Sequence, residues 1–121
     1  MKSRRIGIIS PSSPSNDKSR KFDEKKQFKK GLETLEKLGL ECVLGAHAKN
    51  ALHYVSAPIK ESLQDLHNFY RDPDIKLIIA ANGGCNANQL LSGLDLDLIM
   101  KNSGDKPLVG CSDISVLLNA I

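Results

Sequence analysis

The chain has 121 residues, of which 40% are hydrophobic and 26% are charged, and its formal net charge at pH 7 is +3. Such values are typical of one soluble globular domain with a single hydrophobic core. No apolar run approaches the roughly 20 residues that are needed to cross a bilayer. The apolar run that begins at Ile6 is also too short for the core of a signal peptide, so we expect a cytoplasmic protein without a membrane partner.

Charge and cysteine content narrow the range of ligands. The net positive charge comes largely from the block between Lys18 and Lys37, where Lys and Arg are mixed with acidic residues, and only 4% of the residues are aromatic. Such a block is typical of a solvated helix face, and few aromatic side chains are present to stack on bases, so we expect no nucleic-acid partner. The three cysteines, Cys42, Cys85 and Cys111, are too widely spaced for a disulfide framework or a paired zinc site. We expect reduced, mostly buried thiols, no metal and no cofactor.

The first part of the chain predicts a strand, a loop, a helix and a second strand. Residues 5–9 form a compact apolar run, and the prolines and hydroxyl side chains of residues 10–17 exclude both a helix and a central strand. A charged helix follows, and Gly39 stands where a left-handed residue is expected after its last turn. The apolar face of this helix carries Phe28, Leu32, Leu35 and Leu38. Residues 40–44 then have the pattern of a second strand.

The same alternation continues along the rest of the chain. A loop over residues 45–57 is followed by a helix that begins after Pro58 and has an apolar stripe at helical spacing. The stripe consists of Ile59, Leu63, Leu66 and Tyr70. Residues 75–81 predict a strand that is buried on both faces. Four shorter elements complete the pattern: a helix with Leu90 and Leu91, a helix capped by Asp95, a strand at residues 108–109 and an apolar helix from Ile114.

Strands that alternate with helices predict an α/β fold. We expect a mainly parallel sheet with helices on both faces, in the three-layer arrangement of flavodoxin-like and Rossmann-like domains. In such sheets ligands bind beyond the carboxyl ends of the strands, which here continue into loops over residues 10–13, 82–85 and 110–113. The chain stops in an apolar helix without a cap, so we interpret residues 1–121 as the N-terminal domain of a truncated polypeptide.

Ser112 lies between the last predicted strand and the last predicted helix. In a sharp strand-to-helix turn its hydroxyl would project from the sheet edge, and free N–H groups of the helix would face a developing oxyanion. The alternative is that Ser112 caps the helix, which is the commonest role of a serine there. Gly83 and Gly84 directly follow the buried strand, where the backbone either approaches a ligand or makes an ordinary turn.

Other nucleophiles and bases are harder to place from the sequence. Cys85 and Cys111 lie beside strand ends, and each is either a thiolate nucleophile or a small buried hydrophobic residue. His67 flanks the core side of its helix, whereas His47 and His53 lie in a loop with no carboxylate that the sequence identifies as an orienting partner. No complete triad can be assembled from these residues.

Six short motifs are distributed over nearly the whole chain, at residues 8–14, 54–57, 71–76, 83–91, 94–99 and 109–114. Their order and spacing resemble the LD-carboxypeptidase and microcin C immunity protein family of serine peptidases. The resemblance implies that Ser112 is the nucleophile of a Ser-Glu-His triad, with the backbone N–H groups of Asp113 and Gly84 in the oxyanion hole. It also implies that the Glu and the His come from a C-terminal domain outside this chain, and that the full-length protein is a homodimer.

The sequence departs from the family pattern at three positions. Cys85 and Cys111 stand where the family usually has Tyr, and Asn82 stands where members that recycle the cell wall typically have Arg. The Asn86-Ala87-Asn88 run is closer to the microcin-immunity branch. The residues expected to contact the substrate are Asn82, Gly83, Cys85 and Asn86.

The resemblance implies cleavage of an amide bond through an acyl-enzyme. The candidate substrates are a muropeptide, cut between an L-centre and D-Ala, and a peptidyl adenylate. Without the missing domain, we expect the chain to be inactive. Two alternatives stay open: a cysteine hydrolase that uses Cys85 or Cys111, and a non-enzymatic flavodoxin-like module that binds a small phosphorylated ligand. The loop of residues 10–15 would bind that ligand, although it has neither the Walker A nor the Gly-x-Gly-x-x-Gly pattern.

Overall fold

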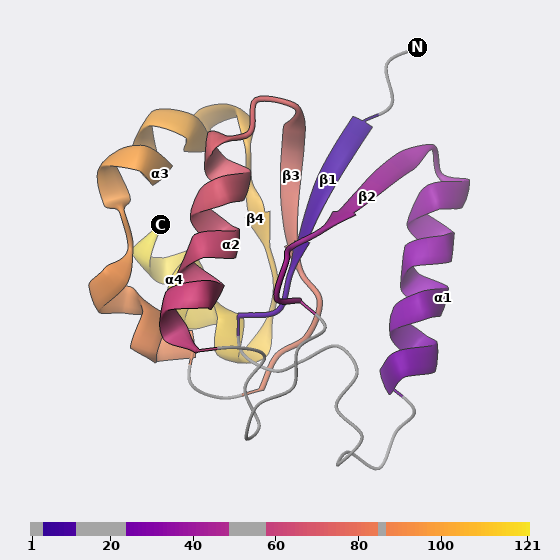
Figure 1. Cartoon of the computed structure of the whole chain (residues 1–121), viewed down its shortest axis with the longest axis horizontal. Helices are drawn as coiled ribbons and strands as arrows, with labels where there is room; N and C mark the ends of the chain where they lie inside the picture. The colour runs from indigo at the N-terminus through magenta and orange to yellow at the C-terminus, as the bar shows by residue number, and fades with distance from the viewer. Residues whose placement is uncertain (1–3, 12–23, 49–57, 85–86) are drawn as a thin grey trace.

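The computed structural model describes residues 4–11, 24–48, 58–84 and 87–121 (Figure 1). Four strands form one parallel sheet in the order β2-β1-β3-β4: β1 (Arg4–Ile9), β2 (Leu40–Leu44), β3 (Ile75–Ala80) and β4 (Leu108–Val109). The α-helices are α1 (Glu24–Lys37), α2 (Ile59–Arg71), α3 (Leu96–Asn102) and α4 (Ser115–Ala120). The 3₁₀ turns are η1 (Ala87–Gly93), η2 (Ser103–Asp105) and η3 (Ser112–Ile114). The predicted α/β class with a parallel sheet and flanking helices is confirmed.

The helices cover the sheet from both sides (Figure 1). α2 packs on β1 and β3 and contacts α3 and η1, whereas α1 contacts β2. The strand order explains this arrangement. The connection from β1 to β2 moves in one direction across the sheet, and those from β2 to β3 and from β3 to β4 move in the other. Because such crossovers are right-handed, the helices of the two directions lie on opposite faces.

Alternating side chains of β1 mark the two faces. A Cβ atom added at Gly7 would lie 2.6 Å from Phe69 of α2, so the absence of a side chain lets this helix lie close to the strand. Ile8 points to the other face and lines a cavity of about 340 Å³ between the sheet and α1. The main core lies under α2 and consists of Ile9, Leu66, Phe69, Tyr70, Ile75, Ile78 and Ile99.

Two residues that the sequence placed on apolar helix faces, Leu38 and Ile59, are exposed in the structure. Leu38 is 72% exposed, because α1 ends at Lys37 and Leu38 lies in the turn that Gly39 completes with a φ of +81°. Ile59 is 41% exposed, because it is the first residue of α2 and precedes the turns that pack on the sheet. The predicted N-cap of α3 is confirmed, since the Asp95 side chain accepts a hydrogen bond from the Leu98 N–H group at 3.0 Å.

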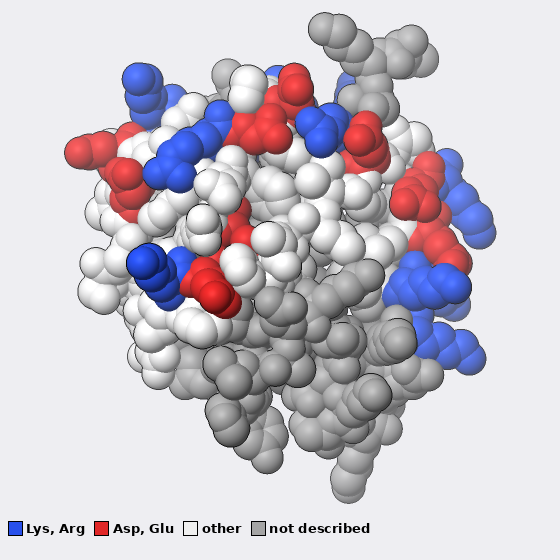
Figure 2. All heavy atoms as spheres, in the orientation of Figure 1, with Lys and Arg blue, Asp and Glu red and all other residues white. Residues whose placement is uncertain are grey.

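Charged side chains of both signs are interspersed on the face shown in Figure 2. The Arg5 guanidinium forms ion pairs with Glu41 at 3.3 Å, Asp72 at 3.9 Å and Asp74 at 3.7 Å. In the part of the chain that the structure describes, no helix combines the length and the apolar character that a membrane span requires.

Candidate active site

β4 leads directly into the turn that carries Ser112. Its two residues pair with Ile78 and Ile79 of β3, so both strands end at the same edge of the sheet. The chain then enters η3, where the Ile114 N–H group donates to the Cys111 carbonyl oxygen at 3.2 Å, and continues as α4. A Cβ atom added at Gly110 would lie 2.5 Å from Ile114 Cγ2, so the sharpness of this turn requires glycine.

Ser112 has a φ of +58° and is the one non-glycine residue with a positive φ among the described residues. This left-handed conformation costs about 1–3 kcal/mol in a residue that carries a Cβ, so the surrounding packing must hold it. The capping alternative is wrong, because Cys111 occupies the N-cap position of η3, and neither η3 nor α4 has a side-chain cap hydrogen bond. The exposed Ser112 side chain is therefore presented at the sheet edge without a capping role.

The loop after β3 lies directly against Ser112. A Cβ atom added at Gly83 would be 2.9 Å from Ser112 Cβ and 3.2 Å from Ser112 Oγ. Gly84 is exposed and has a φ of 153°, a backbone conformation that residues with side chains rarely adopt. The structure thus brings together three of the predicted site residues from two separate loops. Asn82 is half-buried and lines the cavity below α1, while Cys85 and Asn86 lie outside the described residues.

The side chain of Asp113 connects these two loops. Its Oδ2 atom accepts a hydrogen bond from the Ala87 N–H group at 2.9 Å, at the start of η1. Since η1 follows the glycine loop, this carboxylate fixes the loop relative to the Ser112 turn. The sequence pointed to the backbone N–H group of Asp113 and missed the role of its side chain, which depends on a partner 26 residues away.

No side chain in the described part of the chain donates or accepts a hydrogen bond at Ser112 Oγ. Of the two described histidines, His47 is the one held by a carboxylate: its Nδ1 atom lies 2.9 Å from Oδ1 of the buried Asp65. Asp65 Oδ2 also accepts the His47 backbone N–H group at 2.9 Å, and Glu61 Oε2 lies 3.7 Å from His47 Nε2. His47 thus has an orienting carboxylate, Asp65, which was not identified from the sequence. The sequence signal was Asp65 itself, a carboxylate on the buried side of α2.

His47 and Ser112 nevertheless follow the two outermost strands of the sheet. His47 follows β2 and Ser112 follows β4, with β1 and β3 between them. Three strand intervals correspond to about 14 Å, since neighbouring strands are about 4.8 Å apart. The His47–Asp65 pair therefore anchors the turn after β2 to α2. A Cβ atom added at Gly45 in that turn would lie 2.7 Å from Asp65 Oδ2, which agrees with such close packing.

His67 lies on the flank of α2, as the sequence predicted. Its Nε2 atom accepts a hydrogen bond from the Asp95 N–H group at 3.0 Å, which requires a neutral imidazole. Partial burial lowers the pKa of His67, and the Arg71 cation lowers it further, while the Asp95 carboxylate acts in the opposite direction. This histidine holds the start of α3 and is unconnected with Ser112.

The two cysteines that the structure describes differ from the expected buried thiols. Cys111 is exposed directly before Ser112, and Cys42 is partly exposed on β2. Burial, with a smaller contribution from the Glu36 carboxylate, raises the pKa of the Cys42 thiol and so disfavours a thiolate. Among the described ranges, no group of three or more histidine, cysteine, aspartate or glutamate side chains is arranged to hold a metal ion.

Comparison with known proteins identifies the family of this chain. The family described as the LD-carboxypeptidase N-terminal domain of the S66 peptidases matches residues 6–121. A probable murein peptide carboxypeptidase of Bacillus subtilis is 37% identical over 116 residues, which are 96% of this chain and 33% of that protein. The murein tetrapeptide carboxypeptidase of Pseudomonas aeruginosa is 40% identical over 74% of the chain and 29% of its own length. The microcin C7 self-immunity protein MccF of Escherichia coli is 35% identical over 96% of the chain and 32% of its own length.

Solved structures show the same fold. An MccF mutant in complex with adenosine monophosphate has a TM-score of 0.85 and 34% identity, over 96% of this chain and 32% of that one. A muramoyltetrapeptide carboxypeptidase from Oxalobacter formigenes has a TM-score of 0.76 and 25% identity, over 93% of this chain and 34% of that one. The chain thus spans about a third of the length of these relatives. With residues 6–121 matched, the chain belongs to the S66 peptidase family and corresponds to the N-terminal domain of its LD-carboxypeptidases.

Proposed function

We propose that this chain supplies the nucleophile and the oxyanion hole of a serine peptidase that cleaves a small amide substrate through an acyl-enzyme. The observation that carries the proposal is the left-handed Ser112, which is exposed at the apex of a strand-to-helix turn and caps neither following element. Strained residues of this kind concentrate at functional sites. Because the chain belongs to a peptidase family, the strain at Ser112 supports a role of this residue as the nucleophile.

In the proposed reaction Ser112 Oγ attacks the carbonyl carbon of the scissile amide, and a base accepts the hydroxyl proton. The backbone N–H groups of Asp113 and Gly84 donate hydrogen bonds to the oxyanion. The C–N bond then breaks, the same base returns the proton to the leaving amine, and water hydrolyses the ester at Ser112. The glycine at position 83 supports this assignment, because any side chain there would occupy the space beside Ser112 Oγ.

The base and its orienting carboxylate are proposed to be a His and a Glu from residues beyond this chain. Two observations support this view. No described side chain is bonded to Ser112 Oγ, and His47 follows β2, which is three strands away from β4. Residues 1–121 alone are then expected to show no turnover, whereas measurable turnover by that segment would contradict the proposal.

The substrate is proposed to be a murein tetrapeptide with an L-centre linked to D-Ala, or an aminoacyl or peptidyl nucleotide. The first follows from the relatives that are named murein tetrapeptide carboxypeptidases. The second follows from MccF, whose structures contain adenosine monophosphate or aspartyl sulfamoyl adenosine. Asn82, Gly83, Cys85 and Asn86 are proposed to contact this substrate, and the full-length enzyme is proposed to be a homodimer in the cytoplasm.

The test uses the full-length protein that contains this chain, with a murein tetrapeptide and an aminoacyl nucleotide amide as substrates. Ser112→Ala is expected to lower kcat by a factor on the order of 10⁶, as loss of a serine nucleophile does elsewhere. Cys111→Ala is the matched control, because it truncates the exposed neighbour and leaves the Ser112 hydroxyl intact. A fluorophosphonate is expected to form an O–P bond at Ser112 with release of fluoride.

Wild-type turnover of both substrates by Ser112→Ala would refute the proposed nucleophile. Loss of turnover in Cys111→Ala, combined with stoichiometric inactivation of the wild-type enzyme by iodoacetamide, would favour the cysteine alternative instead.

A further inference from the structure

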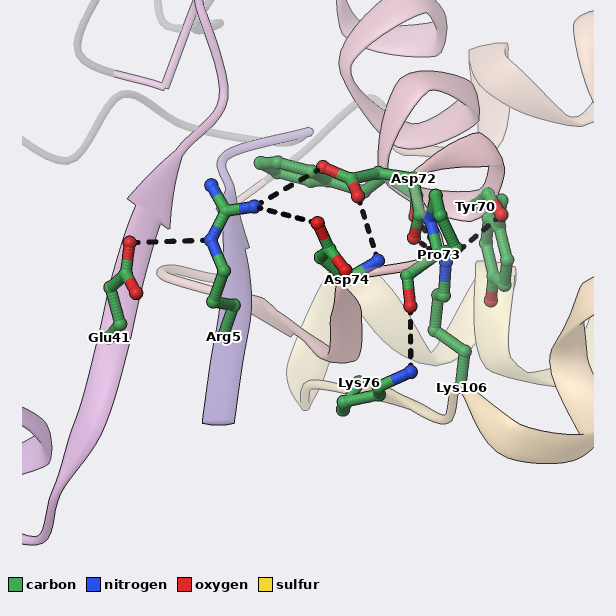
Figure 3. A network of polar contacts seen from close by, with 9 residues as sticks. Arg5, Glu41, Tyr70, Asp72, Pro73, Asp74, Lys76 and Lys106 are labelled. Carbon is green, nitrogen blue, oxygen red and sulfur yellow. Dashed lines mark hydrogen bonds and ion pairs between the residues drawn. The ribbon is translucent and has the colours of Figure 1, made fainter. Parts of the chain in front are cut away.

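Lys106 is a buried lysine two residues before β4, the strand that leads to Ser112. It is only 6% exposed. Its ammonium group donates hydrogen bonds to the backbone carbonyl oxygens of Phe69 at 2.6 Å, Tyr70 at 3.0 Å and Asp72 at 2.5 Å (Figure 3). An ammonium has three N–H donors, and each of them has a carbonyl partner here.

The three carbonyl groups belong to the carboxyl end of α2. The last carbonyls of a helix have no partner within the helix, and this end carries the negative side of the helix dipole. A cation with three donors therefore matches it both in charge and in number of bonds. Burial lowers the pKa of Lys106 and the Lys76 cation lowers it further, while the Asp72 carboxylate acts in the opposite direction.

A wider polar network lies around Lys106, at the end of the sheet where the strands begin (Figure 3). Arg5 at the start of β1 bonds to Glu41 of β2 and pairs with Asp72 and Asp74 in the turn before β3. Lys106 attaches the residues before β4 to the same turn through the Asp72 carbonyl. The beginnings of all four strands are thus connected, and β4 is included through Lys106.

β4 depends on this attachment more than the other strands do. It has two residues, and among the described strands it pairs only with β3. A hydrogen bond from the Ile78 N–H group to the Pro107 carbonyl oxygen, 3.0 Å long, adds one further contact at its start. A displacement of so short a strand along its axis would move Gly110 and Ser112 with it.

We propose that Lys106 is a positioning residue for Ser112. By bonding to the carboxyl end of α2, Lys106 fixes β4 along its axis. It thereby fixes the Ser112 hydroxyl, which lies beyond the other end of β4. This inference rests on the proposed role of Ser112 as nucleophile. It differs from a purely stabilising role, because it requires that a folded protein without the Lys106 cation binds substrate normally and reacts slowly.

The test compares Lys106→Met with Lys101→Met in the full-length protein, and both variants are assayed below their unfolding temperatures. Lys101 is an exposed lysine of α3 that lines the same surface hollow as Lys106, so its removal changes the local charge equally. Lys106→Met is expected to lower kcat about a hundredfold, the effect of a displacement of about 1 Å, and to leave KM within about twofold. Lys101→Met is expected to retain both constants.

Ser112→Ala is measured in parallel and separates the two proposals. Wild-type turnover by Ser112→Ala would refute the proposed nucleophile, whereas an inactive Ser112→Ala together with wild-type kcat in folded Lys106→Met would overturn the positioning role alone. A rise in KM with unchanged kcat would also overturn it. If Lys106→Met does not fold, Lys106→Gln, which keeps a donor for the carbonyls, is assayed under the same criteria. Failure of both variants to fold would show that Lys106 serves folding and would overturn the proposal.

Discussion

The substitution Gly83→Ala tests the contact between the two loops of the candidate active site. The added Cβ atom would lie 2.9 Å from Ser112 Cβ, whereas carbon atoms in favourable contact are about 3.5–4.0 Å apart. Ser112 or the glycine loop must therefore move by about 0.6–1 Å to restore that separation. The backbone itself accepts alanine, because Gly83 is not among the glycines with a positive φ.

A displacement of about 1 Å in a reacting group lowers the rate about a hundredfold, which corresponds to about 2.7 kcal/mol of activation free energy. The expected effect on the free energy of unfolding is smaller, because overpacking costs about 1–3 kcal/mol and the lower entropy of the unfolded alanine chain offsets about 0.4–1 kcal/mol. Gly83→Ala is thus expected to raise the activation free energy by more than it lowers the free energy of unfolding.

The assay measures kcat/KM and urea unfolding of the full-length protein. Gly104→Ala is the matched control, because a Cβ atom there would meet no heavy atom within 4 Å and Gly104 also lacks a positive φ. It shares the backbone entropy effect and is expected to retain wild-type kcat/KM. A Gly83→Ala protein with wild-type kcat/KM would refute the inference that the glycine loop and Ser112 form one site.

Two further predictions concern the residues that support the fold. Asp65→Ala removes both hydrogen bonds to His47 and is expected to lower the free energy of unfolding by about 2–4 kcal/mol. The control Glu36→Ala, at an exposed position, is expected to change it by no more than about 0.5 kcal/mol. Equal urea midpoints for the two variants would contradict this. Because the pKa of His67 is lowered in the folded state, the unfolded chain binds the proton first. The contribution of His67 to the free energy of unfolding is therefore fully present above about pH 6.5 and decreases as the pH falls toward the folded-state pKa. His67→Gln is expected to reduce this pH dependence of the free energy measured by urea unfolding. An unchanged pH dependence would show that another group is responsible.

Local patterns predicted most of the fold. Apolar runs and helical spacing gave β2 with its observed bounds, and Gly39 and Asp95 marked a helix end and a helix start because their roles depend only on near neighbours. Leu38 was misplaced because periodicity does not show where a helix stops. Its exposure follows from the end of α1, one residue earlier.

The candidate site was predictable in its residues and less so in its supports. The Ser112 turn and the two glycines could be read from the sequence because each lies next to a strand end. The partners of Asp113, Asp65 and Lys106 are backbone groups or side chains 18 or more residues away, and only the folded sheet brings them together. Ser112 illustrates both limits. A serine before a helix favours a cap, and that role is excluded only by the structure, in which Cys111 occupies the N-cap position and no side-chain cap hydrogen bond forms.

The central location of β1 constrains the order in which this domain can fold. β1 is the first strand of the chain, yet Ile6 pairs with Cys42 on one side and with Leu77 on the other. During synthesis its apolar side chains therefore have no complete sheet to join until residues 75–80 have emerged. Such non-local parallel pairing is slow and leaves apolar segments open to association with other chains. The strand at the centre of the finished core is thus the segment that depends longest on protection during biosynthesis.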